Sequence, residues 1–152
     1  MKRILLLVIS LFALTSNAQK SESENVKATI IEFFDAFHKQ DTITLKLMAK
    51  GNIKMQSISI DKDGKTVLSE NDYFQFVQNI ASISKDRTFE EKLLDFTIKV
   101  DGNMANAWTP YEFWYQKKLS HCGVNSFQLI KEEGKWLIIY LVDTRRREGC
   151  QD

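Results

Sequence analysis

The chain has 152 residues, and its 21 basic and 20 acidic side chains leave a formal net charge of +1. This length suits one domain with a single hydrophobic core. The two signs of charge are interspersed, and the basic cluster Arg145-Arg146-Arg147 is too small to form a nucleic-acid-binding surface. We therefore expect no nucleic-acid partner.

The N-terminus has the pattern of a secretory signal peptide. Lys2 and Arg3 precede an apolar run over residues 4–14, and small or polar residues follow as far as Ala18. The run is too short to span a bilayer, so a membrane anchor is the weaker alternative. Cleavage after Ala18 would leave residues 19–152 as one exported domain, periplasmic or secreted, with no further contact with the membrane.

Two cysteines, Cys122 and Cys150, are candidates for a disulfide. One lies at the start of a predicted hairpin and the other just beyond its end, so antiparallel pairing would bring them together. An exported protein would keep such a bond, and two unlinked thiols are the alternative. Two cysteines without further ligands do not make a zinc site, so we expect no metal and no other cofactor.

Three helices are predicted in the first half of the chain. Apolar residues spaced by three and four between Val26 and Phe37 indicate an amphipathic helix. Asp41 can cap a short second helix over residues 42–48. Ser69 with Asp72 resembles a capping box that opens a third helix over residues 70–82. Two strands, 53–60 and 65–68, are expected between the second and third helices.

The second half of the chain is predicted to form four long strands. Two of them cover residues 89–100 and 104–115, and a turn at Glu133-Gly134 joins the other two between Ser120 and Cys150. Pro110 lacks a backbone donor, so a bulge or bend is expected there. The order α-α-β-β-α-β-β-β-β predicts an α+β fold in which three helices pack on a curved, mainly antiparallel sheet.

Three segments carry a resemblance to a known family. They are A-N-A-W-T-P-Y-E-F-W-Y (105–115), L-S-H-C-G-V-N-S-F-Q-L (119–129) and G-K-W-L-I-I-Y-L-V-D-T-R-R (134–146). With the element order, they resemble the cone-shaped nuclear transport factor 2-like superfamily. Within it, they resemble the small secreted bacterial members that are often grouped as lumazine-binding-like proteins. The resemblance covers essentially all of residues 19–152.

The resemblance implies a pocket but no particular reaction, because this superfamily hosts both enzymes and non-catalytic binding or dimerisation domains. Ketosteroid isomerase needs a tyrosine donor, whereas the first predicted helix carries phenylalanines. Scytalone dehydratase depends on two histidines in its pocket, and this chain has only His38 and His121. The Asp-Arg-Asp arrangement of limonene epoxide hydrolase has no evident counterpart. We therefore assign no catalytic residue.

Side-chain alternation predicts which residues face the cavity of the cone. Counting back from the turn at Glu133-Gly134 and from a turn at Lys117-Lys118 places bulky aromatic side chains on one face, which we assign to the concave side. Polar groups lie among them, as is usual in a ligand site. The predicted ligand-binding residues are Trp108, Glu112, Trp114, His121, Asn125 and Tyr140.

The opposite face is predicted to carry an apolar stripe of Leu137, Ile139 and Leu141, with Asp143 at its end. An exposed stripe of this kind usually marks an interface. We therefore expect a homodimer through the outer face of the sheet, as the resemblance also implies.

Two polar clusters are candidates for chemistry. His121 and Glu112 could form an acid/base pair, although a histidine that only fixes strand register is the simpler alternative. Asp143, Arg145 and Arg146 could bind an anion or form a structural salt bridge.

Three functions remain open from the sequence. The primary hypothesis is an exported protein that binds a small, partly apolar molecule without turning it over. The second is an isomerase, dehydratase or hydrolase that uses the pair His121 and Glu112. The third is a structural dimerisation module whose cavity is filled by Trp108, Trp114 and Tyr140.

Overall fold

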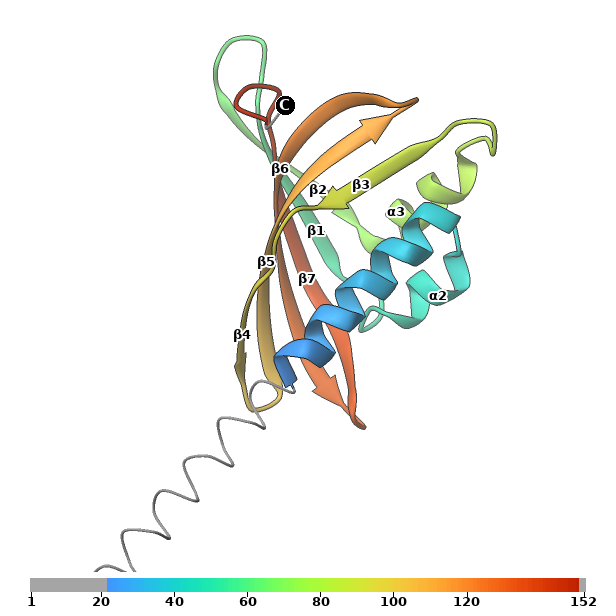
Figure 1. The fold of residues 1–152 in the computed structure, drawn as a ribbon, viewed down its shortest axis with the longest axis vertical. Coiled ribbons are helices and arrows are strands. Elements are labelled where there is room, and N and C mark those ends of the chain that lie inside the picture. Colours follow the sequence, from blue (N-terminus) through green and yellow to red (C-terminus); the bar gives the residue numbers. More distant parts are fainter. Residues whose placement is uncertain (1–21, 151–152) are drawn as a thin grey trace, which may run out of the picture.

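The structure, a computed structural model, describes residues 22–150, so the predicted signal peptide at 1–18 lies outside the described residues. A first helix covers residues 22–39 and is drawn in blue in Figure 1. It is followed by α2 (Thr42–Leu47), β1 (Lys54–Ile60), β2 (Thr66–Asp72), α3 (Tyr73–Ser82), β3 (Phe89–Leu93), β4 (Thr97–Asp101), β5 (Met104–Tyr115), β6 (Lys118–Glu132) and β7 (Lys135–Arg145). None of the described helices is long and apolar enough to span a membrane.

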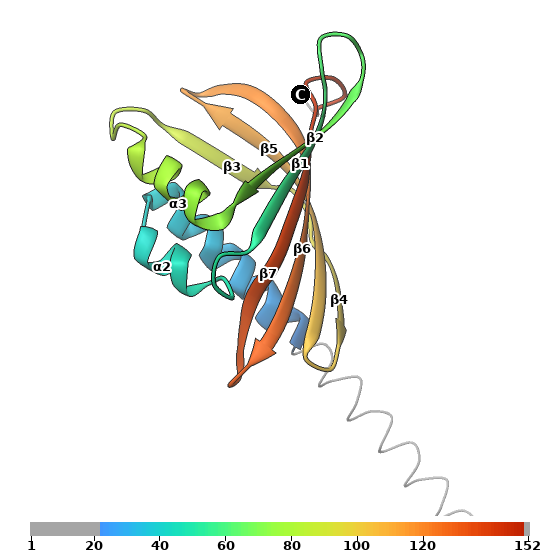
Figure 2. The same cartoon turned by 180° about the vertical axis from the view of Figure 1, so that it is seen from behind.

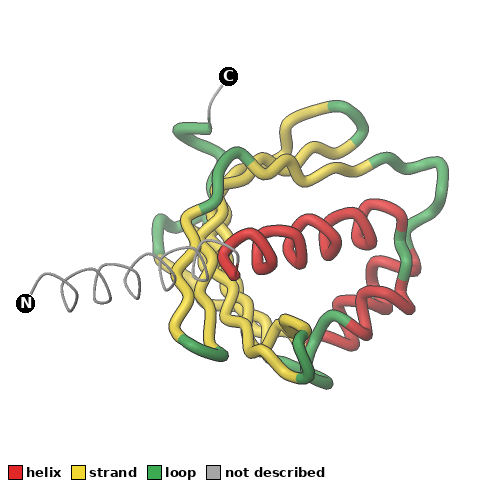
Figure 3. The backbone as a smooth tube through the Cα atoms, turned by 60° about the horizontal axis from the view of Figure 1, so that its bottom comes forward, coloured by secondary structure: helices red, strands yellow, loops and turns green. Residues whose placement is uncertain are grey.

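The seven strands form one sheet in the order β2-β1-β7-β6-β5-β3, and β4 also pairs with β5. Every pair is antiparallel except β1 with β7. All three helices lie on one face of the sheet (Figures 1 and 2), and the sheet curves around the first helix (Figure 3). The predicted α+β fold, with helices on a curved and mainly antiparallel sheet, is confirmed.

The predicted strand over residues 89–100 is in fact two strands, β3 and β4. The interruption at residues 94–96 lies opposite Thr109 and Pro110 of β5, so three residues face two. Leu94 N donates to Pro110 O at 2.9 Å, but proline has no N–H to return a bond. The irregularity expected at Pro110 therefore falls in the partner strands, while β5 itself continues through this residue.

Aspartates cap both short helices. Asp41 Oδ1 accepts from the backbone N–H groups of Ile43 and Thr44 at 3.1 Å, as predicted. Asp72 Oδ1 accepts from Gln75 N at 2.8 Å and caps α3. The predicted start of this helix at residue 70 is wrong, because pairing with β1 keeps β2 extended up to Asp72.

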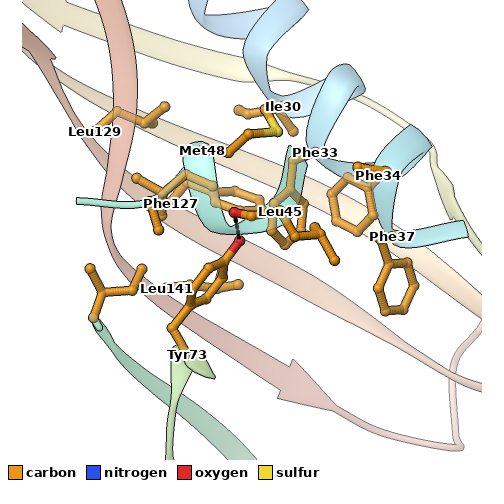
Figure 4. Packing of buried hydrophobic residues seen from close by; sticks show 14 of the residues in the cluster. Ile30, Phe33, Phe34, Phe37, Leu45, Met48, Tyr73, Phe127, Leu129 and Leu141 are labelled. Atoms are coloured by element: carbon orange, nitrogen blue, oxygen red, sulfur yellow. Dashed lines mark hydrogen bonds between the residues drawn. The ribbon is translucent and has the colours of Figure 1, made fainter. Parts of the chain in front are cut away.

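The core lies between the first helix and the concave face of the sheet. Val26, Ile30 and Phe33 are buried on the helix, as their spacing predicted, and they face the sheet residues Phe127 and Leu129. Figure 4 shows Ile30 and Phe33 packed with Phe127 and Leu129, and the hydroxyl of Tyr73 donating to Leu45 O at 2.6 Å. Each fully buried large apolar side chain contributes about 1.5–3 kcal/mol. This packing fixes the helix across the sheet and leaves a cavity beside it.

Candidate functional site

A β-bulge in the last hairpin changes which side chains face inward. The turn at Glu133-Gly134 and the pair Leu129–Ile138 are as predicted. The register then shifts, and Ile139 becomes the extra residue, so Phe127 pairs with Leu141 and Asn125 with Asp143. The predicted pairs Phe127–Tyr140 and Asn125–Val142 are therefore wrong.

The turn between β5 and β6 shifts the faces of β5 as well. It is centred on Gln116 and Lys117, both of which have positive φ angles, rather than on Lys117-Lys118. A second register shift follows between Phe113 and Trp114, and as a result His121 pairs with Phe113. Since one residue of shift exchanges the two faces, Tyr111 and Phe113 face inward and the even-numbered residues of β5 face outward.

Because of these shifts, the six predicted ligand-binding residues lie on two different faces of the sheet. His121 and Asn125 line a cavity on the concave side of the sheet. The other four, Trp108, Glu112, Trp114 and Tyr140, belong to the outer face of the sheet, so the prediction that they face the cavity is wrong. Trp114 Nε1 donates to Glu112 Oε2 at 3.0 Å, and the hydroxyl of Tyr140 donates to Gln56.

Two further hypotheses are corrected by the same geometry. Glu112 cannot form an acid/base pair with His121 across the cavity, because the two side chains lie on opposite faces of the sheet. Trp108, Trp114 and Tyr140 do not fill the cavity. The hypothesis of a structural dimerisation module whose cavity is filled by these three side chains is therefore wrong. Leu141 and Asp143, expected on the outer stripe, face inward and are buried.

The cavity has a volume of about 310 Å³ and lies between the helices and the concave face of the sheet. One part of its wall is apolar and strongly aromatic, whereas the other part is polar. Its lining residues are Phe33, Phe34, Phe37, Met55, Gln56, Ser57, Asn71, Phe76, Asn79, Ile80, Glu91, Tyr111, Phe113, His121, Asn125, Leu141, Asp143 and Arg145. The volume and the mixed lining are those of a small-molecule site.

A buried carboxylate organises the polar wall. Asp143 Oδ2 accepts a hydrogen bond from the hydroxyl of Tyr111 at 3.1 Å and another from Arg145 Nε at 2.8 Å. The same hydroxyl also contacts Thr144 O at 3.0 Å. The salt-bridge alternative for Asp143 and Arg145 is thus present, and both residues face the cavity rather than the outer stripe.

Gly123 makes this arrangement possible. It pairs with Tyr111, and a Cβ atom placed on it would lie 1.7 Å from Thr144 O. A side chain at this position would push β7 away and separate Asp143 from Tyr111. Here glycine is required for the close approach of two backbones.

Glu91 is a second carboxyl group on the cavity wall. Asn125 Nδ2 donates to Glu91 Oε1 at 2.7 Å, and the Glu91 backbone N–H donates to His38 Nε2 at 2.8 Å. Burial raises the pKa of Glu91 to about 8, although the hydrogen bond from Asn125 acts in the opposite direction, and the nearby charge of Asp143 adds to the rise. Glu91 is therefore mostly a neutral carboxylic acid at neutral pH.

His121 lies against aromatic rings of the wall. Its ring stacks on Phe113 with centroids 4.9 Å apart, and it meets Tyr111 edge to face at 5.8 Å. Burial lowers the pKa of His121, and the positive charge of Arg145 lowers it further. The imidazole is therefore neutral at pH 7 and can accept a proton or a hydrogen bond.

Two buried hydroxyls on the inner face have no hydrogen-bond partner among the described residues. They are Ser57 Oγ and Thr109 Oγ1. Both lie in one row across the sheet, Thr109–Asn125–Asp143–Ser57. Ser57 is 8% exposed and lines the cavity. Because buried polar groups are normally satisfied, this row is open to a polar group of a ligand or to water.

A disulfide closes the chain next to the site. Cys122, the neighbour of His121, is bonded to Cys150, which confirms the predicted pairing. Cys122 and Arg146 also exchange backbone hydrogen bonds at 2.9 Å in each direction. Together these contacts hold the last described residues against the first part of β6. No group of three or more metal-ligating side chains occurs within residues 22–150.

Several solved structures have the same arrangement of elements. A proposed dehydratase of the nuclear transport factor 2-like family from Streptomyces avermitilis is 13% identical, with a TM-score of 0.62 over 84% of this chain and 98% of that one. A nuclear transport factor 2-like protein of unknown function from Shewanella baltica is 15% identical, with a TM-score of 0.59 over 84% and 96%. The fold is nuclear transport factor 2-like.

A proposed scytalone dehydratase from Novosphingobium aromaticivorans is also similar, with 9% identity and a TM-score of 0.67 over 87% of this chain and 89% of that one. At these identities the likeness establishes the nuclear transport factor 2-like fold and no shared chemistry. No family model matches the sequence, and no curated protein matches it. The resemblance to the lumazine-binding-like subgroup therefore stays a prediction.

Sequence reasoning missed Glu91, Tyr111 and Phe113 as site residues. Glu91 lies in a charged segment, F-E-E-K-L, where the alternation of burial alone marks it as inward-facing. Tyr111 follows Pro110 and was placed on the wrong face with the rest of β5. In the structure, Glu91 pairs with Phe113 and Phe113 pairs with His121. A prediction that β3 pairs with β5 in this register would have placed these residues on the same face as His121.

Proposed function

We propose that the protein binds a small, planar, partly apolar molecule in the cavity and does not turn it over. The observation that carries this proposal is the cavity of about 310 Å³ with an aromatic and a polar part to its wall. Ligand sites commonly have this size and this combination of linings.

The aromatic part of the wall favours a flat ligand. Phe37 and Phe76 stack with centroids 5.9 Å apart, and Phe33 meets Phe34 edge to face at 5.1 Å. Rings packed in this way offer flat surfaces that change shape little on binding. An aromatic or conjugated skeleton would bury its faces against them and keep its polar atoms for Asn125, His121 and Ser57.

Native mass spectrometry of the protein purified from its own source tests the proposal. A retained small molecule would add a constant mass to the folded protein and would disappear on denaturation. Two variants of α3 provide a matched pair. Asn79→Trp places a large side chain on a residue that lines the cavity, whereas Gln78→Trp places it on the exposed neighbouring residue. Binding should be lost only in Asn79→Trp, and equal retention in both variants would contradict the proposal.

An acid/base enzyme is the second candidate, because Glu91 and His121 flank Phe113 in one row of the sheet. Glu91 is neutral and can give a proton, while His121 is neutral and can take one. A ligand lying over Phe113 would have an acid on one side and a base on the other. Isomerisation and dehydration both need such a pair. The original pairing of His121 with Glu112 is replaced by this one.

Exchange of hydrogen for deuterium at the carbon next to a carbonyl tests the enzymatic candidate. If this candidate is right, indanone incubated in heavy water with the protein should exchange faster than in buffer alone, as followed by proton NMR. His121→Ala should abolish the acceleration, and Asn79→Trp should abolish it by blocking the cavity. Exchange at the buffer rate would remove this candidate and leave the binding function.

We further propose that the protein is a homodimer through the outer face of the sheet. On this face Met104, Trp108 and Ile139 are 57%, 49% and 38% exposed, and the neighbouring Asn106, Ser126 and Gln128 carry no charge. Leu137 and Ile139 of the predicted stripe belong to this face, whereas Leu141 does not. Sedimentation velocity should give twice the chain mass, and Trp108→Asp should give the chain mass. A monomeric parent protein would contradict the proposal.

Export remains a proposal that rests on the order of basic, apolar and small residues in the first 18 positions. The disulfide supports it, because such bonds persist in oxidising compartments. N-terminal sequencing of the protein from its own source should begin at Gln19. A sequence that begins at Met1 or Lys2 would contradict cleavage.

A further inference from the structure

We propose that the ligand carries a carbonyl-type oxygen and that Glu91 binds this oxygen as a neutral carboxylic acid, by donating its O–H. This inference rests on the proposed binding function and names the chemistry that the polar wall selects. It assigns Glu91, which sequence analysis did not single out, as the residue that determines specificity.

The polar wall of the cavity holds more carboxyl groups than positively charged groups. Two carboxyl groups, Glu91 and Asp143, face the cavity, but a single guanidinium, that of Arg145, is beside them. Arg145 Nε bonds Asp143, and Tyr111 donates to the same carboxylate oxygen. No basic side chain within residues 22–150 forms an ion pair with Glu91. Asp143 thus has the compensating charge, and Glu91 is left to be neutral.

The hydrogen bond from Asn125 fixes which oxygen of Glu91 is free. Asn125 Nδ2 donates to Oε1 at 2.7 Å, so Oε1 acts as the acceptor of the carboxyl group. The proton then lies on Oε2, whose O–H has no partner among the described side chains. Glu91 is only half-buried and lines the cavity, so this donor is accessible to a ligand.

The ionisable side chains around Glu91 do not change their charge near neutral pH, so they do not disturb the neutral form of Glu91. His38 of the first helix accepts from the Glu91 backbone, and burial lowers its pKa, so it stays neutral. His121 of β6 is neutral for the same reason. Burial raises the pKa of Tyr111 of β5, which keeps its proton. Within residues 22–150, the charges that act on Glu91 are those of the pair Asp143 and Arg145 on β7.

Ser57 gives independent support for a polar ligand group at this wall. Its Oγ is buried, lines the cavity and has no partner within the described chain. Asn125 and Ser57 lie two strands apart in one row, with Asp143 between them. Two strand spacings place their backbones about 10 Å apart. A bicyclic or slightly longer molecule can therefore reach Glu91 with one oxygen and approach Ser57 with its other end.

The raised pKa of Glu91 makes the selection dependent on pH. Below about pH 8 Glu91 is a donor and favours ligands with an acceptor oxygen. Above this pH the carboxylate is an acceptor only, and it repels carbonyl oxygens and favours N–H or O–H groups. As Glu91 ionises, the cavity should therefore change from favouring ligands with an acceptor oxygen to favouring ligands with a donor group.

Three bicyclic probes of nearly equal shape test this inference by isothermal titration calorimetry. Indanone offers an acceptor, indole offers a donor, and indane offers neither. At about pH 7 the wild-type protein should bind indanone in preference to indane, and at about pH 9.5 this preference should fall by roughly 3- to 10-fold. Indole should gain over indane across the same interval.

Glu91→Gln and Glu90→Gln are the matched variants. The amide of Glu91→Gln can accept from Asn125 and still donate into the cavity, so it should keep the preference for indanone at both pH values. Glu90→Gln changes the exposed neighbour and should behave as the wild type. A preference of the wild type that does not change with pH, or its loss in Glu91→Gln, would overturn the inference and leave cavity binding intact.

If the protein binds none of the three probes at either pH, the proposed binding function is rejected, and the inference with it. A readout without ligand completes the test. In protein labelled with ¹³C at glutamate carboxyl carbons, the resonance missing from Glu91→Gln should titrate near pH 8. A transition of this resonance at the pH of ordinary glutamates would also overturn the inference.

Discussion

The two faces of the sheet use the same strands for opposite purposes. The concave face is covered by helices and holds Phe127, which is fully buried, beside the polar groups of the cavity. The convex face leaves Trp108 49% exposed, although Ser126, its partner across β5 and β6, adjoins Phe127. Neighbouring residues on one strand therefore have different roles. A shift of one residue in register decides whether a side chain lies at the site or at an outer surface.

Truncating one large aromatic residue on each face should have very different effects on stability. Phe127→Ala removes a ring that meets both Phe33 and Phe34 edge to face, and it should cost about 3–5 kcal/mol. Trp108→Ala removes a half-exposed ring and should cost about 1 kcal/mol in the monomer. Urea denaturation of dilute protein measures both values. Equal losses in the two variants would contradict the assignment of the faces.

The disulfide allows a second test of the outer face, at the place where the segment that ends at Cys150 is held against Cys122. The bond joins residues 28 positions apart, and Cys122 is buried although it lies on the outer side. Reduction should lower the free energy of unfolding by about 3–4 kcal/mol because the unfolded chain gains freedom. Urea denaturation with and without reductant measures this change. The Cys122→Ser/Cys150→Ser variant should be insensitive to reductant, and sensitivity there would point to another cause.

These two faces also show how far the sequence alone could lead. The first two helices, the Asp41 cap and the hairpin turn at Glu133-Gly134 were predictable, because spacing and capping residues are local signals. The third helix was predicted to begin too early, because its cap is Asp72 rather than Ser69. The burial of Phe33 and Phe37 followed from helical periodicity. The disulfide followed from the ends of a hairpin. Each of these predictions depends on residues close in sequence or on a simple count.

The cavity residues could not be predicted in the same way, because two bulges shift the register. Nothing in the run L-I-I-Y-L marks Ile139 as the extra residue, and nothing in L-S-H marks the shift near Phe113. Counting along a strand assumes that no such residue exists, so the error moved Tyr140 inward and Asp143 outward. Bulges depend on the curvature of the whole sheet, which is a property of the tertiary packing.

Two tyrosines differ in the same way at the level of single hydrogen bonds. Tyr111 is buried, and its hydroxyl contacts Asp143 and Thr144 O, whereas Tyr115 accepts from Arg87 at an exposed position. Tyr111→Phe should cost about 1–3 kcal/mol, because it removes a buried hydrogen-bond donor from the Asp143 carboxylate. Tyr115→Phe should change stability by less than about 0.5 kcal/mol. Thermal unfolding of both variants measures the difference, and similar midpoints would place Tyr111 outside the polar network.

A further test concerns the slope of stability with pH, to which Glu91 contributes. Burial raises its pKa to about 8 in the folded protein, so the native state holds the proton more tightly than the unfolded chain does. The stability that this group contributes is complete below its unfolded pKa, near 4.5, and is lost as the pH rises through about 8. Glu91→Gln should remove this decline, because an amide does not titrate in this range. Denaturation at several pH values measures the slope, and Glu90→Gln should keep it. A wild type and a Glu91→Gln variant with parallel profiles would mean that Glu91 is ionised in the folded protein, as a residue of the outer face would be.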